Sequence, residues 1–306
     1  MLRQYILTRF NLRLWKRNKF LLPVSDTKWL EQRFQLFETY CLPSIMAQSQ
    51  QNFRWIVLFD SETPQIYKDR IKALREKCPQ LSPIWVQPHS SWDFARIFME
   101  VVRYDLELLA KKEIYPTKVA TTYLDNDDAL AKDYLHRVAE ESLKIEQRSV
   151  ITFHYGIQYF EGMKLANRIF YPNNHFQTLV EPINEQQRPI TIYMLGSHAG
   201  IYKIKPDKAL IHEVKTPDRP AWVEVVHQKN IGNDVRPTFD TKLMTKPTLL
   251  KELSDVDAPL TKHPHLKFCT LFALRFPFEY VRHMLVRVFE SQIARLMRIP
   301  QEREKA

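Results

Sequence analysis

Short apolar runs, partly β-branched, alternate with helix-like patterns along the first half of the chain. The runs lie at residues 4–8, 53–59, 84–86, 119–124 and 149–153. Strands that alternate with helices are typical of βαβ units, in which consecutive strands lie parallel in one sheet. The pattern therefore predicts an α/β fold, Rossmann-like, with a mainly parallel sheet flanked by helices.

Four helices are expected between these strands. Between the first two strands, apolar residues recur at spacings of three and four from Leu30 to Ile45 and define one helix face. Pro43 should break or restart this helix, because proline lacks the amide hydrogen that a helix interior needs. The other three helices are expected at residues 64–77, 92–112 and 131–145.

The regular alternation ends near residue 153. The aromatic stretch 153–171 predicts hairpin-like strands, and the proline-containing stretch 172–190 predicts loop and short helix. Residues 191–197 and 221–227 are expected as strands, the second more clearly. Residues 232–264 are polar and contain several prolines, which predicts a linker or surface loop.

The last part of the chain is predicted to be helical, from about residue 268 to 299, with a kink at Pro277. It has a broad apolar face with arginines at its edges. Such a face can rest on an anionic membrane surface or pack against the protein itself, and packing is the commoner case.

Three carboxylates, Asp125, Asp127 and Asp128, directly follow the apolar run 119–124. The carboxyl ends of parallel strands are where open α/β sheets bind ligands. Carboxylates this close repel one another, and a divalent cation such as Mg²⁺ or Mn²⁺ would compensate them. Alternatively, the acidic residues cap a helix that starts near Ala129. The local sequence leaves both interpretations open.

Polar residues also mark the ends of the first two predicted strands. Arg9, Phe10 and Asn11 end the first strand, and Asp60 ends the second. In a doubly wound sheet these positions should converge with the acidic cluster.

Composition restricts the class of partner and compartment. The net charge of +10, from 45 Lys and Arg against 35 Asp and Glu, favours an anionic partner but does not select one. Five glycines leave no glycine-rich phosphate loop, so any phosphate must be held by a metal and basic side chains. Three scattered cysteines fit a reducing compartment. With neither a signal peptide nor a spanning segment recognised, we expect a cytoplasmic protein.

The chain resembles the putative rhamnosyltransferase family of bacteria, which is similar to glycosyltransferases of the GT-A fold. The resemblance covers about residues 5–235. It rests on these segments: Arg9-Phe-Asn11, Arg33-Phe-Gln-Leu-Phe-Glu38, Tyr40-Cys-Leu-Pro-Ser-Ile45, Gln48, Asn52-Phe-Arg-Trp55, Phe59-Asp60, Thr63-Pro64, the acidic segment 121–130 and Trp222-Val-Glu-Val-Val-His-Gln-Lys-Asn230. It implies a GT-A-like domain at 1–235, with a nucleotide-binding half at 1–130 and an acceptor-side half at 131–235. A linker at 236–264 and an amphipathic helical segment at 265–300 complete the expected domain division.

The resemblance also implies a metal site. An Asp-x-Asp motif in such enzymes holds a divalent cation on the diphosphate of a nucleotide sugar. Carried over, Asp125 and Asp127 are the ligands, with Asp128 as a further ligand or sugar contact. His227, at the end of a predicted strand, is the expected third ligand, and Asn230 supports it. The alternative for His227 is an ordinary buried histidine, and His154 and His198 are weaker candidates.

The nucleotide-sugar site is expected to include Arg9, Phe10, Asn11 and Asp60. Arg9 would lie near the phosphate or base, and Asp60 would accept a hydrogen bond from the base. Arg96, before the acidic strand, would reach the diphosphate.

An inverting transferase also needs a base for the acceptor hydroxyl. Asp218 is the first choice, ahead of Glu224 and Asp234, on position alone.

These observations predict a metal-dependent glycosyltransferase that moves a sugar from a nucleotide-diphosphate donor to a saccharide or lipid-linked acceptor in bacterial surface polysaccharide synthesis. Rhamnose as the sugar follows from the family label alone, and the lipid-linked acceptor would bring the protein to the inner membrane surface. One alternative is a nucleotidyltransferase or phosphohydrolase with two metals, which would need more acids at strand ends. A nucleic-acid-binding module is not favoured, because the basic residues are spread along the chain and match no reader motif.

Overall fold

The computed structural model describes residues 1–14, 27–184, 188–196, 198–227 and 241–266. The predictions for Asn230 and Asp234, and nearly all of the predicted C-terminal helical segment, lie outside the described residues.

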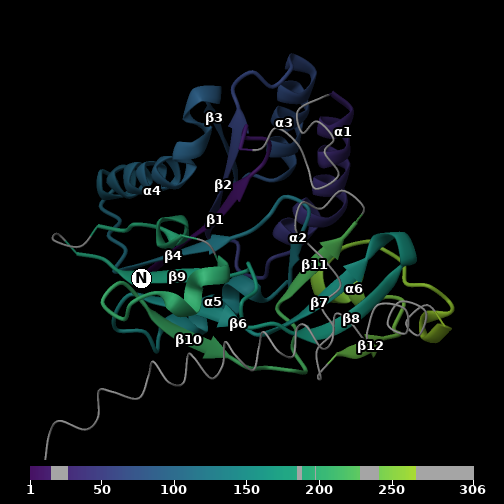
Figure 1. Ribbon diagram of the computed structural model, residues 1–306. Helices are drawn as coiled ribbons and strands as arrows, with labels where there is room; N and C mark the ends of the chain where they lie inside the picture. Colours follow the sequence, from purple (N-terminus) through teal and green to yellow (C-terminus); the bar gives the residue numbers. More distant parts are fainter. Residues whose placement is uncertain (15–26, 185–187, 197, 228–240, 267–306) are drawn as a thin grey trace, which may run out of the picture.

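A seven-stranded sheet with the order β10-β6-β9-β4-β1-β2-β3 forms the centre of the described chain (Figure 1). All pairings between its strands are parallel except those of β9, which runs against both β4 and β6. Its strands are β1 (Leu2–Arg9), β2 (Phe53–Asp60), β3 (Leu81–Val86), β4 (Lys118–Tyr123), β6 (Ser149–Phe153), β9 (Thr178–Pro182) and β10 (Leu210–Val214). The predicted α/β fold with a mainly parallel sheet is confirmed.

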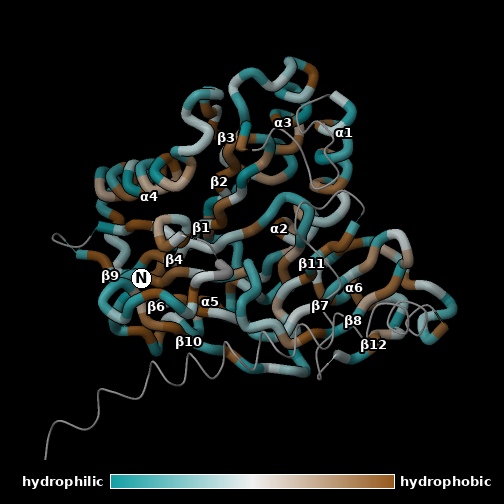
Figure 2. Tube along the Cα trace, in the orientation of Figure 1, coloured by the Kyte–Doolittle hydropathy of each residue, from teal (hydrophilic) through white to brown (hydrophobic). Residues whose placement is uncertain are grey.

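Helices cover both faces of this sheet. One face packs against α1 (Thr27–Leu36), α3 (Gln65–Lys77) and α5 (Tyr134–Ser142). The other packs against α4 (Phe94–Ala110) and the segments around two short 3₁₀ turns, η4 (Ile192–Leu195) and η5 (His198–Lys203). Figure 2 shows the hydrophobic residues along the central strands, as a sheet buried on both faces requires.

The first predicted helix is three consecutive pieces. After α1 the chain makes a π-helical turn (Phe37–Cys41) and continues as α2 (Leu42–Met46). Pro43 lies in the first turn of α2, where its missing amide hydrogen costs little. The expected restart at this proline is therefore confirmed.

A second sheet of five strands carries the order β12-β8-β7-β11-β5. The predicted hairpin at 153–171 is its antiparallel pair β7 (Tyr155–Phe160) and β8 (Leu165–Phe170), linked by a short 3₁₀ turn, η3 (Glu161–Met163). The expected strand at 221–227 is β11 (Trp222–Val226), which pairs with β7.

Two local predictions are wrong, and one of the two interpretations of the acidic cluster is excluded. The acidic cluster does not cap a helix at Ala129, because residues 129–130 form the short strand β5 (Ala129–Leu130), antiparallel to β11. The strand expected at 191–197 is not found, because Ile192–Leu195 form the 3₁₀ turn η4. Part of the predicted linker is ordered structure: β12 (Lys242–Met244) pairs with β8, and Leu250 of α6 (Leu249–Ser254) is buried against β7 and β11.

Within the described ranges, no helix combines the length and the apolar character required to cross a bilayer.

Gly156 on β7 offers a test of how tightly the buried Trp222 ring of the neighbouring strand β11 is packed. A Cβ atom at this position would lie 2.1 Å from the ring of Trp222, which is fully buried. We expect Gly156→Ala to lower the free energy of unfolding by about 1–3 kcal/mol, because the ring must shift within a packed core. Urea denaturation measures the change. Gly162→Ala, where a Cβ would meet no atom within 4 Å, is the control. Equal stability of the two variants would contradict this packing.

Candidate metal and nucleotide-sugar site

The acidic cluster lies at the carboxyl end of β4, beside the end of β1. Its members differ in exposure: the Asp125 side chain is 35 % exposed, whereas Asp127 and Asp128 are buried. The cluster is thus half buried, with Asp125 on its solvent side.

Asp127 is compensated by two side chains from distant parts of the chain. Its Oδ2 accepts hydrogen bonds from Arg33 Nη1 on α1 at 2.7 Å and from His227 Nε2 after β11 at 2.9 Å. Burial opposes ionisation of Asp127, but the charge of Arg33 and the hydrogen bond from His227 hold its pKa below the ordinary value. Asp127 is thus enclosed by the protein rather than open to solvent.

Asp128 makes a separate set of contacts. Its Oδ2 lies 2.7 Å from His175 Nε2, and its Oδ1 accepts a hydrogen bond from the backbone N–H of Val225 on β11 at 2.7 Å. Burial, together with Asp127 and Asp125, raises the pKa of Asp128 to about 7 although His175 opposes this. Burial lowers the pKa of His175, but Asp128 raises it more strongly, to about 9. The pair therefore retains a proton at neutral pH.

His175 reaches the cluster from the connection between β8 and β9. Asn174 shapes this connection: its amide nitrogen donates to the carbonyls of Phe153 and Tyr171, and its Oδ1 accepts from the N–H of Phe176. Phe176 in turn stacks on Trp222, with ring centroids 4.8 Å apart. These contacts fix the backbone on both sides of His175.

Two carboxylates and one imidazole form the candidate metal centre. One ligand atom each from Asp125, Asp128 and His175 lies within 4.8 Å of the others. Carboxylates suit Mg²⁺ and Mn²⁺, and an imidazole ligand shifts the preference towards a transition metal. Metal ligands must be deprotonated, so an ion here would displace the proton of the Asp128–His175 pair. The donor set fits a divalent cation.

Arg9 approaches the cluster from β1. Its Nη2 donates to the hydroxyl of Tyr123 at 2.5 Å and lies 3.8 Å from Asp125 Oδ1. Burial disfavours its charge, but Tyr123, Tyr193 and Asp125 hold the pKa of Arg9 above its ordinary value. A permanent cation therefore stands beside the most exposed carboxylate of the cluster.

Three residues that are predicted to contact the nucleotide, Phe10, Asn11 and Asp60, lie at the ends of β1 and β2. The Phe10 ring lies in the core, 4.7 Å from the ring of Phe34, and its carbonyl accepts a hydrogen bond from Asn126. Asn11 accepts from the N–H of Asp60 and donates to Thr63. The Phe10 ring is therefore buried in the core, and Asn11 links the ends of β1 and β2. Their contact with a nucleotide stays a prediction.

Asp60 is buried and accepts hydrogen bonds from Arg13 Nε at 2.6 Å and from the N–H of Glu62. Its carboxylate already has two donors, so a nucleotide base would compete with Arg13. Its role in base recognition stays a prediction.

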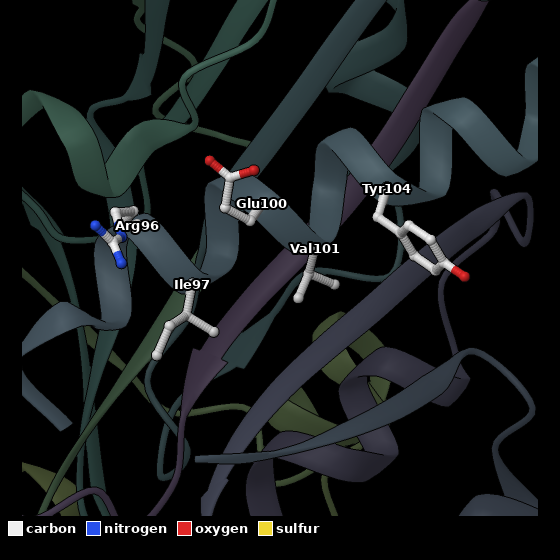
Figure 3. Close-up of a pocket in the computed structure, with 5 residues that line it drawn as sticks. All are labelled: Arg96, Ile97, Glu100, Val101 and Tyr104. Atoms are coloured by element: carbon white, nitrogen blue, oxygen red, sulfur yellow. The ribbon is translucent and has the colours of Figure 1, made fainter. Parts of the chain in front are cut away.

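Arg96 and Asp218, two other predicted site residues, have neighbours outside the acidic cluster. Arg96 is exposed on α4 and lines a hollow with Ile97, Glu100, Val101 and Tyr104, as Figure 3 shows. The Asp218 side chain is 98 % exposed in the loop before β11, with its Oδ1 4.0 Å from Arg168 Nη1 on β8. Its role as a base stays a prediction, as does that of Glu224, which is buried and accepts from Gln158 at 2.8 Å.

Sequence reasoning missed Arg33 and His175. Arg33 belongs to a segment that carried the family resemblance, yet no role followed from its pattern. His175 lies in a stretch that reads as loop, and its proximity to Asp128 arises only when β9 folds back beside β4. A buried acidic cluster needs partners, which is the one signal that could have prompted a search for them.

Comparison with known proteins identifies the family. The family described as putative rhamnosyl transferase matches residues 16–238. The chain belongs to this family. Membership classes it as a glycosyltransferase. A search of curated proteins finds no match.

Solved structures show only a distant likeness to this family member. Crystal structures of S. aureus TarS are similar at 11 % identity over 73 % of this chain and 37 % of that chain, with a TM-score of 0.36. TarS 1–349 in complex with UDP has 12 % identity over 74 % and 61 % of the two chains, with a TM-score of 0.34. A putative glucose-1-phosphate thymidylyltransferase from Bacillus anthracis in complex with a sucrose has 12 % identity over 72 % and 88 %, with a TM-score of 0.31. The chain spans between 37 % and 61 % of the length of the TarS structures.

The buried Arg33–Asp127 pair gives a test of the site's architecture. We expect Arg33→Met to lower the free energy of unfolding by about 3–5 kcal/mol, because it leaves a buried carboxylate short of its cation. Lys144→Met is the control, since Lys144 pairs with Glu141 while 61 % exposed, and such pairs contribute about 0–1 kcal/mol. Chemical denaturation of both variants measures the difference. Similar losses in the two would show that Arg33 does not compensate Asp127.

Proposed function

We propose that this glycosyltransferase is metal-dependent and transfers a sugar from a nucleotide-diphosphate donor to a saccharide or lipid-linked saccharide acceptor. Rhamnose is the proposed sugar, on the family description. The observation that carries the proposal is the convergence of Asp125, Asp128 and His175 next to the Arg9 guanidinium at the carboxyl edge of the sheet.

In this proposal Asp125, Asp128 and His175 hold the cation. Asp125 and Asp127 with His227, the set that the sequence suggests, is the alternative. Arg33 argues for the first set, because Arg33 already compensates the charge of Asp127 at 2.7 Å. When bound, the cation neutralises the charge that develops on a departing diphosphate.

The chain's own residues bind and orient the donor. Arg9 contacts a diphosphate oxygen in this proposal, which is supported by the partial exposure of its guanidinium beside Asp125. Arg33 and His227 hold Asp127 fixed, and the N–H of Val225 holds Asp128, so the acidic loop is ordered before any ligand arrives. A preorganised charged site of this kind favours a transition state in which negative charge moves to the leaving group.

The reaction is proposed to take place on the cytoplasmic side, in bacterial surface polysaccharide synthesis. Cys41 and Cys78 are free and buried, which suits a reducing compartment. An acceptor linked to a lipid would bring the protein into peripheral contact with the inner membrane.

The choice between the two ligand sets can be tested by metal binding. We expect His175→Gln to weaken Mn²⁺ binding by at least tenfold, because an amide is a poorer ligand than an imidazole. His227→Gln, which changes the neighbour of Asp127, should leave Mn²⁺ affinity within about threefold of wild type. Titration followed by electron paramagnetic resonance measures free Mn²⁺. The reverse ranking would favour Asp125, Asp127 and His227.

Donor binding can be tested by thermal stability. We expect a panel of nucleoside diphosphates to include one that raises Tm by several degrees, and only with Mn²⁺ present, because ligand binding to the folded state stabilises it by RT ln(1 + [L]/Kd). Arg9→Gln should reduce this shift. No response to any diphosphate, with salt-sensitive binding to DNA instead, would contradict the proposal.

A further inference from the structure

The carboxylate of Glu181, on β9, anchors the chain segment that follows it. Glu181 is fully buried and accepts four hydrogen bonds. Arg148 Nε donates at 2.9 Å, and the backbone N–H groups of Ile190 and Thr191 donate at 3.1 Å, the Ile190 group to both oxygens. A carboxylate with this many donors holds the backbone at residues 190–191 in one place.

Thr191 has a conformation that its side chain disfavours. Its φ is 68° and its ψ is 157°, a region that is occupied almost only by glycine. Two hydrogen bonds hold it in this conformation. The N–H of Thr191 donates to the Glu181 carboxylate, and the N–H of Ile192 donates to Thr121 Oγ1 at 2.9 Å. Thr191 therefore keeps this backbone conformation because hydrogen bonds fix the chain on both sides of it.

From Glu181 to Tyr193 the chain contacts successive residues of β4, in the direction of the acidic cluster. Glu181 is paired with Val119, near the start of β4, and the next contact is with Thr121. Tyr193 then reaches Tyr123, at the end of β4, with ring centroids 4.7 Å apart. The hydrogen bonds at Glu181 thus help to fix the Tyr193 ring beside Tyr123, four residues beyond Val119 on β4.

Tyr193 forms one wall of the space that holds Arg9. Its ring stacks on Phe98 at 4.9 Å, and the Arg9 guanidinium carbon lies 5.3 Å from its centroid. Phe94 lies on the same guanidinium, at 4.8 Å. Arg9 Nε is buried and has no hydrogen-bond partner among the described residues, so ring contacts and the Tyr123 hydroxyl direct the guanidinium.

We infer that Glu181 is a positioning residue for donor binding: it fixes residues 190–193, which hold the Tyr193 ring against Arg9 and so aim the guanidinium at the diphosphate. The inference rests on the proposed function of Arg9. Glu181 itself contacts no donor, because it lies beside the start of β4, remote from the cluster along the strand.

A double-mutant cycle tests the inference. The probe is the nucleoside diphosphate that stabilises wild type with Mn²⁺, and its Kd is measured by calorimetry for wild type, Glu181→Gln, Arg9→Gln and the double variant. Glutamine is isosteric but loses the charge and one acceptor oxygen. We expect Glu181→Gln to weaken binding about tenfold, the loss that charge-assisted hydrogen bonds of this kind imply. In the Arg9→Gln background the same change should have no further effect on Kd.

Asp105→Asn is the matched control. Asp105 is a buried carboxylate on α4 that accepts hydrogen bonds from Arg3, Tyr5 and Arg54, none of which belongs to residues 190–193. This variant should lose stability and keep its nucleotide affinity. Should Glu181→Gln fail to fold, Glu181→Asp, which keeps the charge and shortens the side chain, enters the same cycle with a smaller expected loss.

The outcomes separate the two proposals. An equal loss of affinity from the Glu181 variant in both backgrounds, or no loss in either, overturns the positioning role. If wild type binds no nucleoside diphosphate with Mn²⁺, the proposed function fails before the cycle is reached.

Discussion

The buried carboxylates that follow β4 need compensation, and the structure around them is arranged to supply it. Asp127 is paired with Arg33 from α1 and His227 after β11, and Asp128 with His175 from the β8–β9 connection. A carboxylate out of water without such partners would cost several kcal/mol. Three segments far apart in sequence are therefore held around one loop of four residues.

This constraint divides the cluster into two kinds of acid. Asp127 is held by a fixed protein cation and orders the loop, whereas Asp128 and His175 share a proton that a metal ion can replace. Asp125, the most exposed of the three, faces solvent beside Arg9. The charge of Asp127 is thus balanced by a fixed side chain, and that of Asp128 by a proton that can be exchanged. This combination suits a site that keeps its shape while ligands enter and leave.

The surroundings of Arg9 show how the fold gives a guanidinium a defined direction without a glycine-rich loop. The guanidinium lies among Phe94, Tyr123 and Tyr193, and the last of these depends on a strained turn fixed by Glu181. Local strain of about 1–3 kcal/mol at Thr191 is tolerated because the bonds on either side of it are buried.

The sequence by itself determined the strands and helices of the first 150 residues, the parallel sheet and the location of the acidic cluster, because hydrophobic periodicity and strand-end polarity are local properties. It did not show that β5 follows the cluster, that residues 241–266 join the second sheet and its core, or that Phe10 faces inward. Only the tertiary structure brought Arg33 and His175 to the carboxylates and Tyr193 to Arg9. Those contacts span 47 to 184 residues of chain, and that of His175 depends on β9 running against β4. Neither spacing nor composition encodes which distant side chain fills a buried charged site.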